Sequence, residues 1–210
     1  MPQATEETED SPTLPLETSE ALPPPAAPAA LWARVLASIV DWMLFMPPAA
    51  ALFYLALRRP EFAPACITVW LLARPAYEIV MHGAFGATLG KMLLRIRVER
   101  FDGEPMDYNA AIRRGFVAAS LALAAAMIAA RVLQAAPLAP FAAVNAATNP
   151  EALRTAIETL LTRLLDNDGY RTLHQFSQLW WVLEWATCLT NPRRRALHDF
   201  IGGTVVVKKK

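Results

Sequence analysis

The sequence predicts an all-α membrane protein with four transmembrane helices, an extramembrane amphipathic helix and a short cytoplasmic β pair. Two observations carry this expectation. First, 55% of the 210 residues are hydrophobic and only 19% are charged, whereas soluble domains usually have about 25% charged residues. Second, four apolar stretches approach the length of about 20 helical residues that a bilayer core of about 30 Å requires.

The first thirty residues differ from the rest of the chain. Residues 1–30 are acidic, rich in proline and free of Lys and Arg. Such a composition cannot bury enough apolar surface to offset chain entropy, so we expect a disordered tail. It lacks the basic start and short apolar core of a signal peptide. We expect the chain to continue as one membrane domain over residues 31–207 and to end in a basic tail over residues 208–210.

Four apolar stretches are the expected transmembrane helices. They cover residues 31–57, 62–82, 116–136 and 173–190. The fourth stretch is short and carries a glutamate, Glu184. A soluble bundle of buried helices is the alternative, but four such stretches in one small chain argue against it.

The placement of basic residues predicts the orientation. The loop over residues 83–115 and the segment after the fourth stretch together hold twelve of the 20 Lys and Arg residues. Short loops rich in Lys and Arg stay in the cytoplasm. We therefore expect both termini on the cytoplasmic side of a cell membrane, most naturally a bacterial inner membrane. The arginines at 193–195 would mark the inner end of the fourth helix.

Residues 150–166, between the third and fourth stretches, predict an amphipathic helix outside the membrane. Pro150 suits a first helical position, and leucine and isoleucine then recur at helical spacing. Arg154, Glu158 and Arg163 lie elsewhere around the helix. We favour a helix lying flat on the outer membrane surface. The alternative is that it packs on neighbouring helices or on another copy of the chain.

Two short stretches of the cytoplasmic side predict strands. The segment "RIRVERF", residues 95–101, alternates before Asp102 and Gly103, a pair that is typical of a turn. The segment "TVVVK", residues 204–208, is β-branched. We expect residues 96–101 and 204–207 to pair with each other, with the glycines at 202 and 203 forming the bend before the second strand.

Ionisable residues interrupt the apolar stretches. Each costs about 2.5–3.5 kcal/mol on insertion scales unless it finds a partner or water. With Asp199, which follows the fourth stretch, they form the candidate functional cluster, which comprises Arg34, Asp41, Arg74, Glu78, Glu184 and Asp199. By helical rise, all the intramembrane members lie in the middle or inner half of the membrane.

Pairing within this cluster can be anticipated. Arg74 and Glu78 are four residues apart and share one helix face. We expect Asp41 to face Arg74 at matching depth, and Arg34 to meet Asp199 at the inner membrane edge. These pairs either only hold helices together, or they form an ion or proton relay or a substrate cavity.

The sequence contains no complete catalytic or metal-binding motif. His198 and Asp199 would need more ligands to hold a metal, and His174 begins the fourth stretch on the outer side. We therefore expect no enzyme, no cofactor and no metal. For His198 and Asp199 we expect a local role, which is to cap a turn and hold the C-terminal strand near Arg34.

Three separated stretches resemble the RDD family of membrane proteins. They are "ARVLASIVDWML", "GATLGKMLLRIRVERFDGEP" and "RALHDFIGGTVVV". The arginine and two aspartates that name the family correspond to Arg34, Asp41 and Asp199. The supporting motif positions are Gly90, Lys91, Asp102, Gly103, His198, Gly203 and Thr204. The resemblance covers roughly residues 31–115 and 176–207, and leaves out the tail and the segment near 140–172.

This resemblance implies an integral membrane protein for which transport is often suggested, without naming a substrate. One expected function is a small transporter or an ion- or proton-coupled carrier, acting as an oligomer because four helices are few for a transport path. The other is a membrane scaffold or regulatory partner without transport. The expected partners are the lipid bilayer, another copy or another membrane protein, and a small ion or solute. We expect no nucleic acid.

Overall fold

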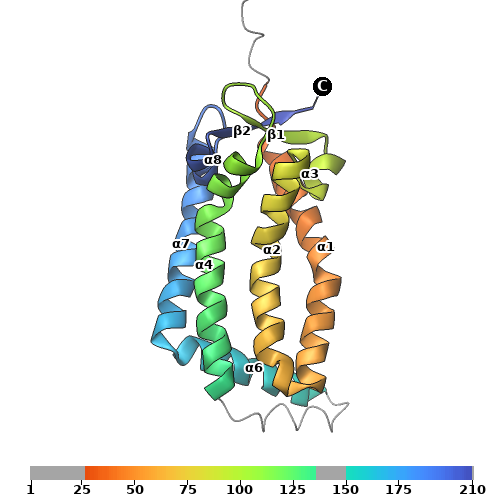
Figure 1. Cartoon of the computed structure of the whole chain (residues 1–210), viewed down its shortest axis with the longest axis vertical. Coiled ribbons are helices and arrows are strands. Elements are labelled where there is room, and N and C mark those ends of the chain that lie inside the picture. The colour runs from red at the N-terminus through yellow and green to blue at the C-terminus, as the bar shows by residue number, and fades with distance from the viewer. Residues whose placement is uncertain (1–26, 136–149, 210) are drawn as a thin grey trace, which may run out of the picture.

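Four long helices run side by side, and a small sheet with two short helices covers one end of them (Figure 1). The computed structural model describes residues 27–135 and 150–209. The long helices are α1 (Leu31–Arg58), α2 (Ala63–Phe85), α4 (Tyr108–Ala135) and α7 (Asp168–Thr190). The mostly helical fold agrees with the expectation. We refer to the end that carries the sheet as the inner end, and to the opposite end as the outer end.

Two of these helices, α1 and α4, are long and apolar enough to cross a membrane. Helices α2 and α7 are 23 residues long each. Charged side chains interrupt them, with Arg74 and Glu78 in α2 and Glu184 in α7. Length and composition therefore support two of the four expected spans among the described residues.

The helix boundaries differ from the expected ones mainly at the third and fourth stretches. Helix α4 already begins at Tyr108, because the Asp107 side chain accepts a hydrogen bond from the Ala110 amide at 2.6 Å and so caps the first turn. Helix α7 begins at Asp168, where the Asn167 side chain caps it in the same way. Residue 136, the expected end of the third stretch, lies outside the described residues.

The inner end carries two short helices and two strands. They are α3 (Leu89–Leu93), β1 (Ile96–Arg100), α8 (Leu197–Gly202) and β2 (Thr204–Lys208). Strands β1 and β2 pair antiparallel, with Val98 opposite Val206. This confirms the expected strand pair. Gly203 joins α8 to β2 with a φ of 63°, a conformation that favours glycine.

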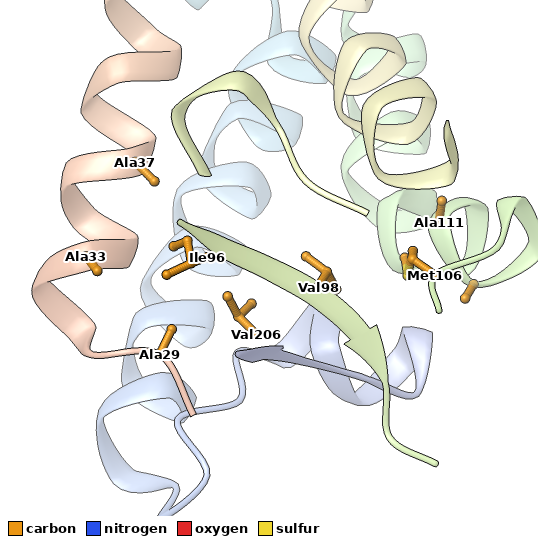
Figure 2. Close-up of a cluster of buried hydrophobic side chains, with 9 residues drawn as sticks. Ala29, Ala33, Ala37, Ile96, Val98, Met106, Ala111 and Val206 are labelled. Atoms are coloured by element: carbon orange, nitrogen blue, oxygen red, sulfur yellow. The ribbon is translucent and has the colours of Figure 1, made fainter. Parts of the chain in front are cut away.

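A small apolar core lies between the sheet and the ends of α1 and α4 (Figure 2). Ala33 and Ala37 of α1 face Ile96 of β1, while Val98 and Val206 pack together from the two strands. The helix contributes only methyl groups here, so its backbone can approach the sheet closely. This packing fixes the sheet against the inner ends of the helices.

The expected tails need two corrections at this core. Residues 27–30 pack along β2, since the Ala29 amide donates to the Val206 carbonyl at 2.9 Å and Ala29 is buried. The open edge of β2 supplies the backbone partners that keep this segment ordered. Residues 1–26 of the expected disordered tail lie outside the described residues. At the other terminus, Lys208 belongs to β2, and Lys210 is not among the described residues.

Helix α6 (Pro150–Asp166) matches the expected amphipathic helix and crosses the outer end of the long helices (Figure 1). Its Ala156 is buried in a small cluster with Leu57 of α1. Leu164 is buried as well. The helix therefore packs on neighbouring helices, which was the alternative to the favoured surface position. The short 3-10 helix η1 (Pro60–Phe62) joins α1 to α2 at the same end.

Large apolar side chains are exposed along the outward faces of the long helices. Examples on α1 and α7 are Trp32, Met43, Tyr54, Phe176, Leu179, Trp181, Val182 and Leu189. Monomeric soluble proteins rarely expose contiguous apolar patches of this kind.

Candidate functional site

Asp41 holds α3 against α1. Its carboxylate accepts hydrogen bonds from the Tyr77 hydroxyl at 3.0 Å, from the Thr88 hydroxyl at 2.6 Å and from the Gly90 amide at 2.8 Å. We call this group the Asp41 cluster. The side chain is buried, and the three donors satisfy its oxygens in place of water.

This arrangement corrects the expected contact between Asp41 and Arg74. The expectation was based on matching depth along two helices. Instead, α3 folds back alongside α1 and brings its own donors to Asp41. Arg74 is paired with Glu78 on its own helix.

Gly90 explains why α3 can come so close. A Cβ atom at this position would lie 2.1 Å from the Ala37 carbonyl oxygen and 3.0 Å from the Asp41 Cγ. Only a residue without a side chain fits between the two helices. The motif position Gly90 therefore serves both as a close contact and as a backbone donor to Asp41.

Asp199 lies at the centre of a second group at the inner end. Arg34 Nη1 donates to its Oδ2 at 3.1 Å, which confirms the expected contact between the two. Arg114 of α4 donates to the other oxygen, Oδ1. The Ala196 amide and the Thr204 hydroxyl donate to the same carboxylate, at 2.9 and 3.2 Å. The Asp199 side chain is fully buried. Both of its carboxylate oxygens accept hydrogen bonds from these groups.

The ionisation of Asp199 follows from these neighbours. Burial by itself would raise the pKa of the carboxyl group. The charges of Arg114 and Arg34, together with the hydrogen bond from the Ala196 amide, outweigh burial and hold the pKa well below its usual range. Asp199 is thus a permanent anion that ties α1, α4 and α8 together.

His198 links this group to α7. Its Nε2 lies 2.6 Å from Arg114 Nη2 and its Nδ1 lies 2.6 Å from Glu184 Oε1. Because a guanidinium N–H can only donate, Nε2 is the acceptor and Nδ1 carries the proton directed at Glu184. We call the five side chains of Arg34, Arg114, Glu184, His198 and Asp199 the Asp199 network.

Lys91 of α3 lies beside this network. Its Nζ is 2.7 Å from Nε2 of His82, near the end of α2. Burial, together with the positive charge of Arg114, lowers the pKa of Lys91 to about 7. Lys91 therefore changes charge near neutral pH, in a place where α2 and α3 meet.

A third polar group lies among apolar residues, further from the inner end. Arg74 Nε and Glu78 Oε1 are 3.1 Å apart, as the spacing of four residues predicts, and the Arg74 guanidinium lies 4.7 Å from the centre of the Trp42 ring. The two charged side chains keep 36% and 37% of their surface exposed. They line a cavity of about 270 Å³ between α1, α2 and α4. We call it the Arg74 groove; its other lining residues include Phe45, Trp70, Ala118 and Ala122.

Asp102 and Gly103 lie apart from these groups. They form the turn after β1, in which the Asp102 side chain accepts from the Glu104 amide at 3.1 Å. Arg100 also donates to Asp102, at 2.6 Å. Gly103 has a φ of 89°. These two motif positions therefore shape a turn.

Several members of the site did not emerge from the sequence. Arg114 was counted only as a basic residue of the loop, and Tyr77, Thr88 and His82 were not singled out as site residues. No spacing rule connects them to Asp41 or Asp199, because their positions depend on how α2, α3 and α4 pack. In residues 27–135 and 150–209, no three His, Cys, Asp or Glu side chains gather so as to hold a metal ion.

Comparison with known proteins adds the family. The model of the RDD family matches residues 28–203, including the segment near 140–172 that the resemblance in sequence had left out. Comparison with curated proteins found no match, and neither did comparison with solved structures. The matched region spans most of the chain and contains Arg34, Asp41 and Asp199. This chain therefore belongs to the RDD family.

Proposed function

We propose that this protein spans the inner membrane with four helices, keeps both termini in the cytoplasm, and carries a small ion or solute as an oligomer. The observation that carries the proposal is the Arg74 groove. It combines a half-exposed ion pair with aromatic walls, within helices whose outward faces are apolar. Ionisable side chains at such a depth are costly and usually mark a substrate or ion pathway.

The arrangement of the helix ends supports the topology. Both ends of the described chain lie at the inner end, because the Lys208 amide donates to the Ala27 carbonyl and the Lys209 amide donates to the Arg95 carbonyl. The short helices α3 and α8 lie at the same end (Figure 1). The basic residues of the 83–115 loop and of the C-terminal segment gather there too. An inner end rich in Lys and Arg fits the cytoplasmic side.

The outward faces support assembly into an oligomer. Helix α1 packs on α2 and α3, and α7 packs on α4 and α6, which leaves apolar side chains exposed on both outer helices. Four helices enclose little space for a path. A second copy would complete it, while lipid would cover the remaining faces.

Flux through purified protein in liposomes tests the carrier function. Vesicles that contain a pH-sensitive dye would be exposed to sodium, potassium or chloride gradients. We expect a flux that Glu78→Gln abolishes, because the variant removes the carboxylate charge from the groove. Glu158→Gln is the matched control, since Arg154 and Glu158 form the same i,i+4 pair on the exposed face of α6. Equal flux in the two variants would contradict a path through the groove.

A scaffold or assembly partner without transport is the second candidate. The Asp199 network favours it, because Arg34, Arg114 and Asp199 are buried and hold three elements in fixed positions. A protein of this kind would show a stable membrane partner in pull-down experiments and no flux for any tested ion.

A further inference from the structure

The polar atoms of the Arg74 groove form a complementary pair of binding groups. Arg74 uses its Nε to bind Glu78. Both residues line the groove. Among the described residues, neither side chain has another hydrogen bond, so the two Nη groups and one carboxylate oxygen remain available to a ligand. The Arg74–Glu78 pair has no net charge but offers free donors and a free acceptor. It therefore suits a ligand that carries one positive and one negative group.

The Trp42 ring fixes this pair in place. The guanidinium of Arg74 stacks 4.7 Å from the ring centre, and a cation above an aromatic face is held by the ring quadrupole. This contact favours the position of the Arg74 side chain beside the groove. The free N–H groups of Arg74 can donate to an acidic group of a ligand, and the Glu78 carboxylate can bind an ammonium group.

The groove changes from polar to apolar along its length. Glu78 lies about two helical turns nearer to the inner end than Trp70, by the rise of α2. Trp70 packs edge-on against Phe45 of α1, with ring centres 6.4 Å apart. Ala118 and Ala122 of α4 leave room opposite these rings. A ligand with its charges at Glu78 and Arg74 would place an apolar group beside Phe45 and Trp70.

The size of the groove limits the ligand further. At about 270 Å³ it is close to the lower end of small-molecule sites, which span roughly 300–1,000 Å³. A two-chain lipid does not fit in this space. A small molecule with an ammonium, an acidic group and one apolar side group does.

We propose that the Arg74 groove binds a small zwitterion with an apolar side group, of the chemical class of a free apolar amino acid. The ammonium contacts Glu78, the acidic group contacts Arg74, and the side group lies against Phe45 and Trp70. This inference deepens the proposed function and rests on it, because the groove is the site assigned to the carried solute.

Calorimetry with the full chain in detergent or nanodiscs tests the proposal. The probes are L-phenylalanine, phenethylamine, which lacks the carboxylate, and 3-phenylpropanoate, which lacks the ammonium. We expect L-phenylalanine to bind the native protein at least about tenfold more tightly than either truncated probe, since each lacks one charge-assisted contact. Equal affinities, or no saturable binding of L-phenylalanine, would overturn the proposal without need of any variant.

Variants assign the contacts. Glu78→Gln should weaken L-phenylalanine and phenethylamine by about tenfold and spare 3-phenylpropanoate, because only the ammonium loses its partner. Glu158→Gln should leave all three affinities unchanged. A uniform effect of Glu78→Gln on the three probes would contradict the assignment. So would binding of phosphatidylethanolamine from vesicles in place of L-phenylalanine, since it would make the groove a lipid site.

The two proposals can fail separately. If L-phenylalanine does not bind but Glu78-dependent ion flux persists, the ligand class is wrong and the carrier function stands. If L-phenylalanine binds with the expected pattern while no flux of ions or of L-phenylalanine occurs, the ligand class stands and the carrier function is wrong.

Discussion

At the scale of single residues, the two arginines that hold Asp199 differ in how fully they are used. Arg114 contacts Asp199 and Thr204 through Nη1, and His198 through Nη2. Arg34 contacts Asp199 and the Cys188 sulfur through Nη1 alone. Its Nε and Nη2 are buried without a hydrogen-bond partner among the described residues. Arg114 therefore depends on its fork geometry and Arg34 mainly on its charge.

Replacement by lysine separates these two roles. Arg114→Lys keeps the charge but loses at least one charge-assisted hydrogen bond, so it should destabilise the protein by about 1.5–3 kcal/mol. Arg34→Lys keeps the single contact to Asp199 and relieves two buried donors, so it should cost less than about 1.5 kcal/mol. Thermal unfolding of the purified variants measures the difference. Arg131→Lys, at an exposed position of α4, is the control. A larger loss for Arg34→Lys than for Arg114→Lys would contradict this account.

Lys91 predicts how stability depends on pH. Burial and the charge of Arg114 lower the pKa of Lys91 from 10.5 to about 7. Between these two values the unfolded chain binds the proton and the folded protein does not, so stability should rise as pH increases from about 7 towards 10. Below pH 7 both states are protonated and the penalty is fully present. Lys91→Met should remove this rise, as seen in melting temperatures of the two proteins across the range. Parallel pH curves would rule out Lys91 as the cause.

At the scale of elements, α3 belongs to the Asp41 cluster and carries Lys91, whose pKa responds to the charges of the Asp199 network. Thr88 caps α3 by accepting from the Lys91 amide at 3.4 Å, and its hydroxyl also donates to Asp41. Lys91 extends from the same short helix to His82. Five helical residues make little core of their own. The position of α3 therefore depends on Asp41 and on close contact with α1.

Gly90→Ala tests this dependence. The added Cβ would meet the Ala37 carbonyl at 2.1 Å, so α3 must move away from α1 and lose hydrogen bonds to Asp41. We expect a loss of at least about 1–3 kcal/mol, the usual range for overpacking. Protease sensitivity of the 83–115 loop should rise in the same variant. Gly169→Ala is the control, because its nearest contact would be 3.3 Å away, on the exposed Asn167 side chain. If Gly90→Ala were as stable as Gly169→Ala, the close contact between α3 and α1 would be disproved.

At the scale of the whole molecule, the inner and outer ends are built differently. The inner end contains the sheet, the Asp41 cluster and the Asp199 network, whereas α6 and a small apolar cluster cover the outer end. At the inner end, Asp199 is buried between Arg34 and Arg114, which come from two different long helices, so this contact resists separation of the helices. The exposed apolar faces lie between the two ends.

Reporter fusions test the orientation of these ends. Reporters placed after Pro105 and after Lys210 should be cytoplasmic, since Pro105 and strand β2 lie at the end rich in Lys and Arg. A reporter near residue 149 should be external, because α6 lies at the opposite end of the molecule. An external C-terminus would contradict the four-span arrangement.

The sequence by itself determined the elements that rest on local patterns. Helical spacing and Pro150 predicted α6 with its correct bounds. Alternation and β-branching predicted β1 and β2, and the spacing of Arg74 and Glu78 predicted their pair. These patterns depend on residues that are close in the sequence, so they can be recognised without knowing how the helices pack. Arg34 and Asp199 carry opposite charges and lie at the same expected depth, and this was enough to predict an ion pair between them.

Only the tertiary structure decided which partners the remaining charges take. Depth along a helix placed Asp41 beside Arg74, but the fold-back of α3 at Gly90 brings Thr88 and a backbone amide to Asp41 first. Arg114 joins Asp199 because α4 and α8 pack closely, although 84 residues separate the two in sequence. A buried carboxylate binds whichever donors the packing brings within reach. Packing between distant elements has no local signature in the sequence, and it is packing that completes the site.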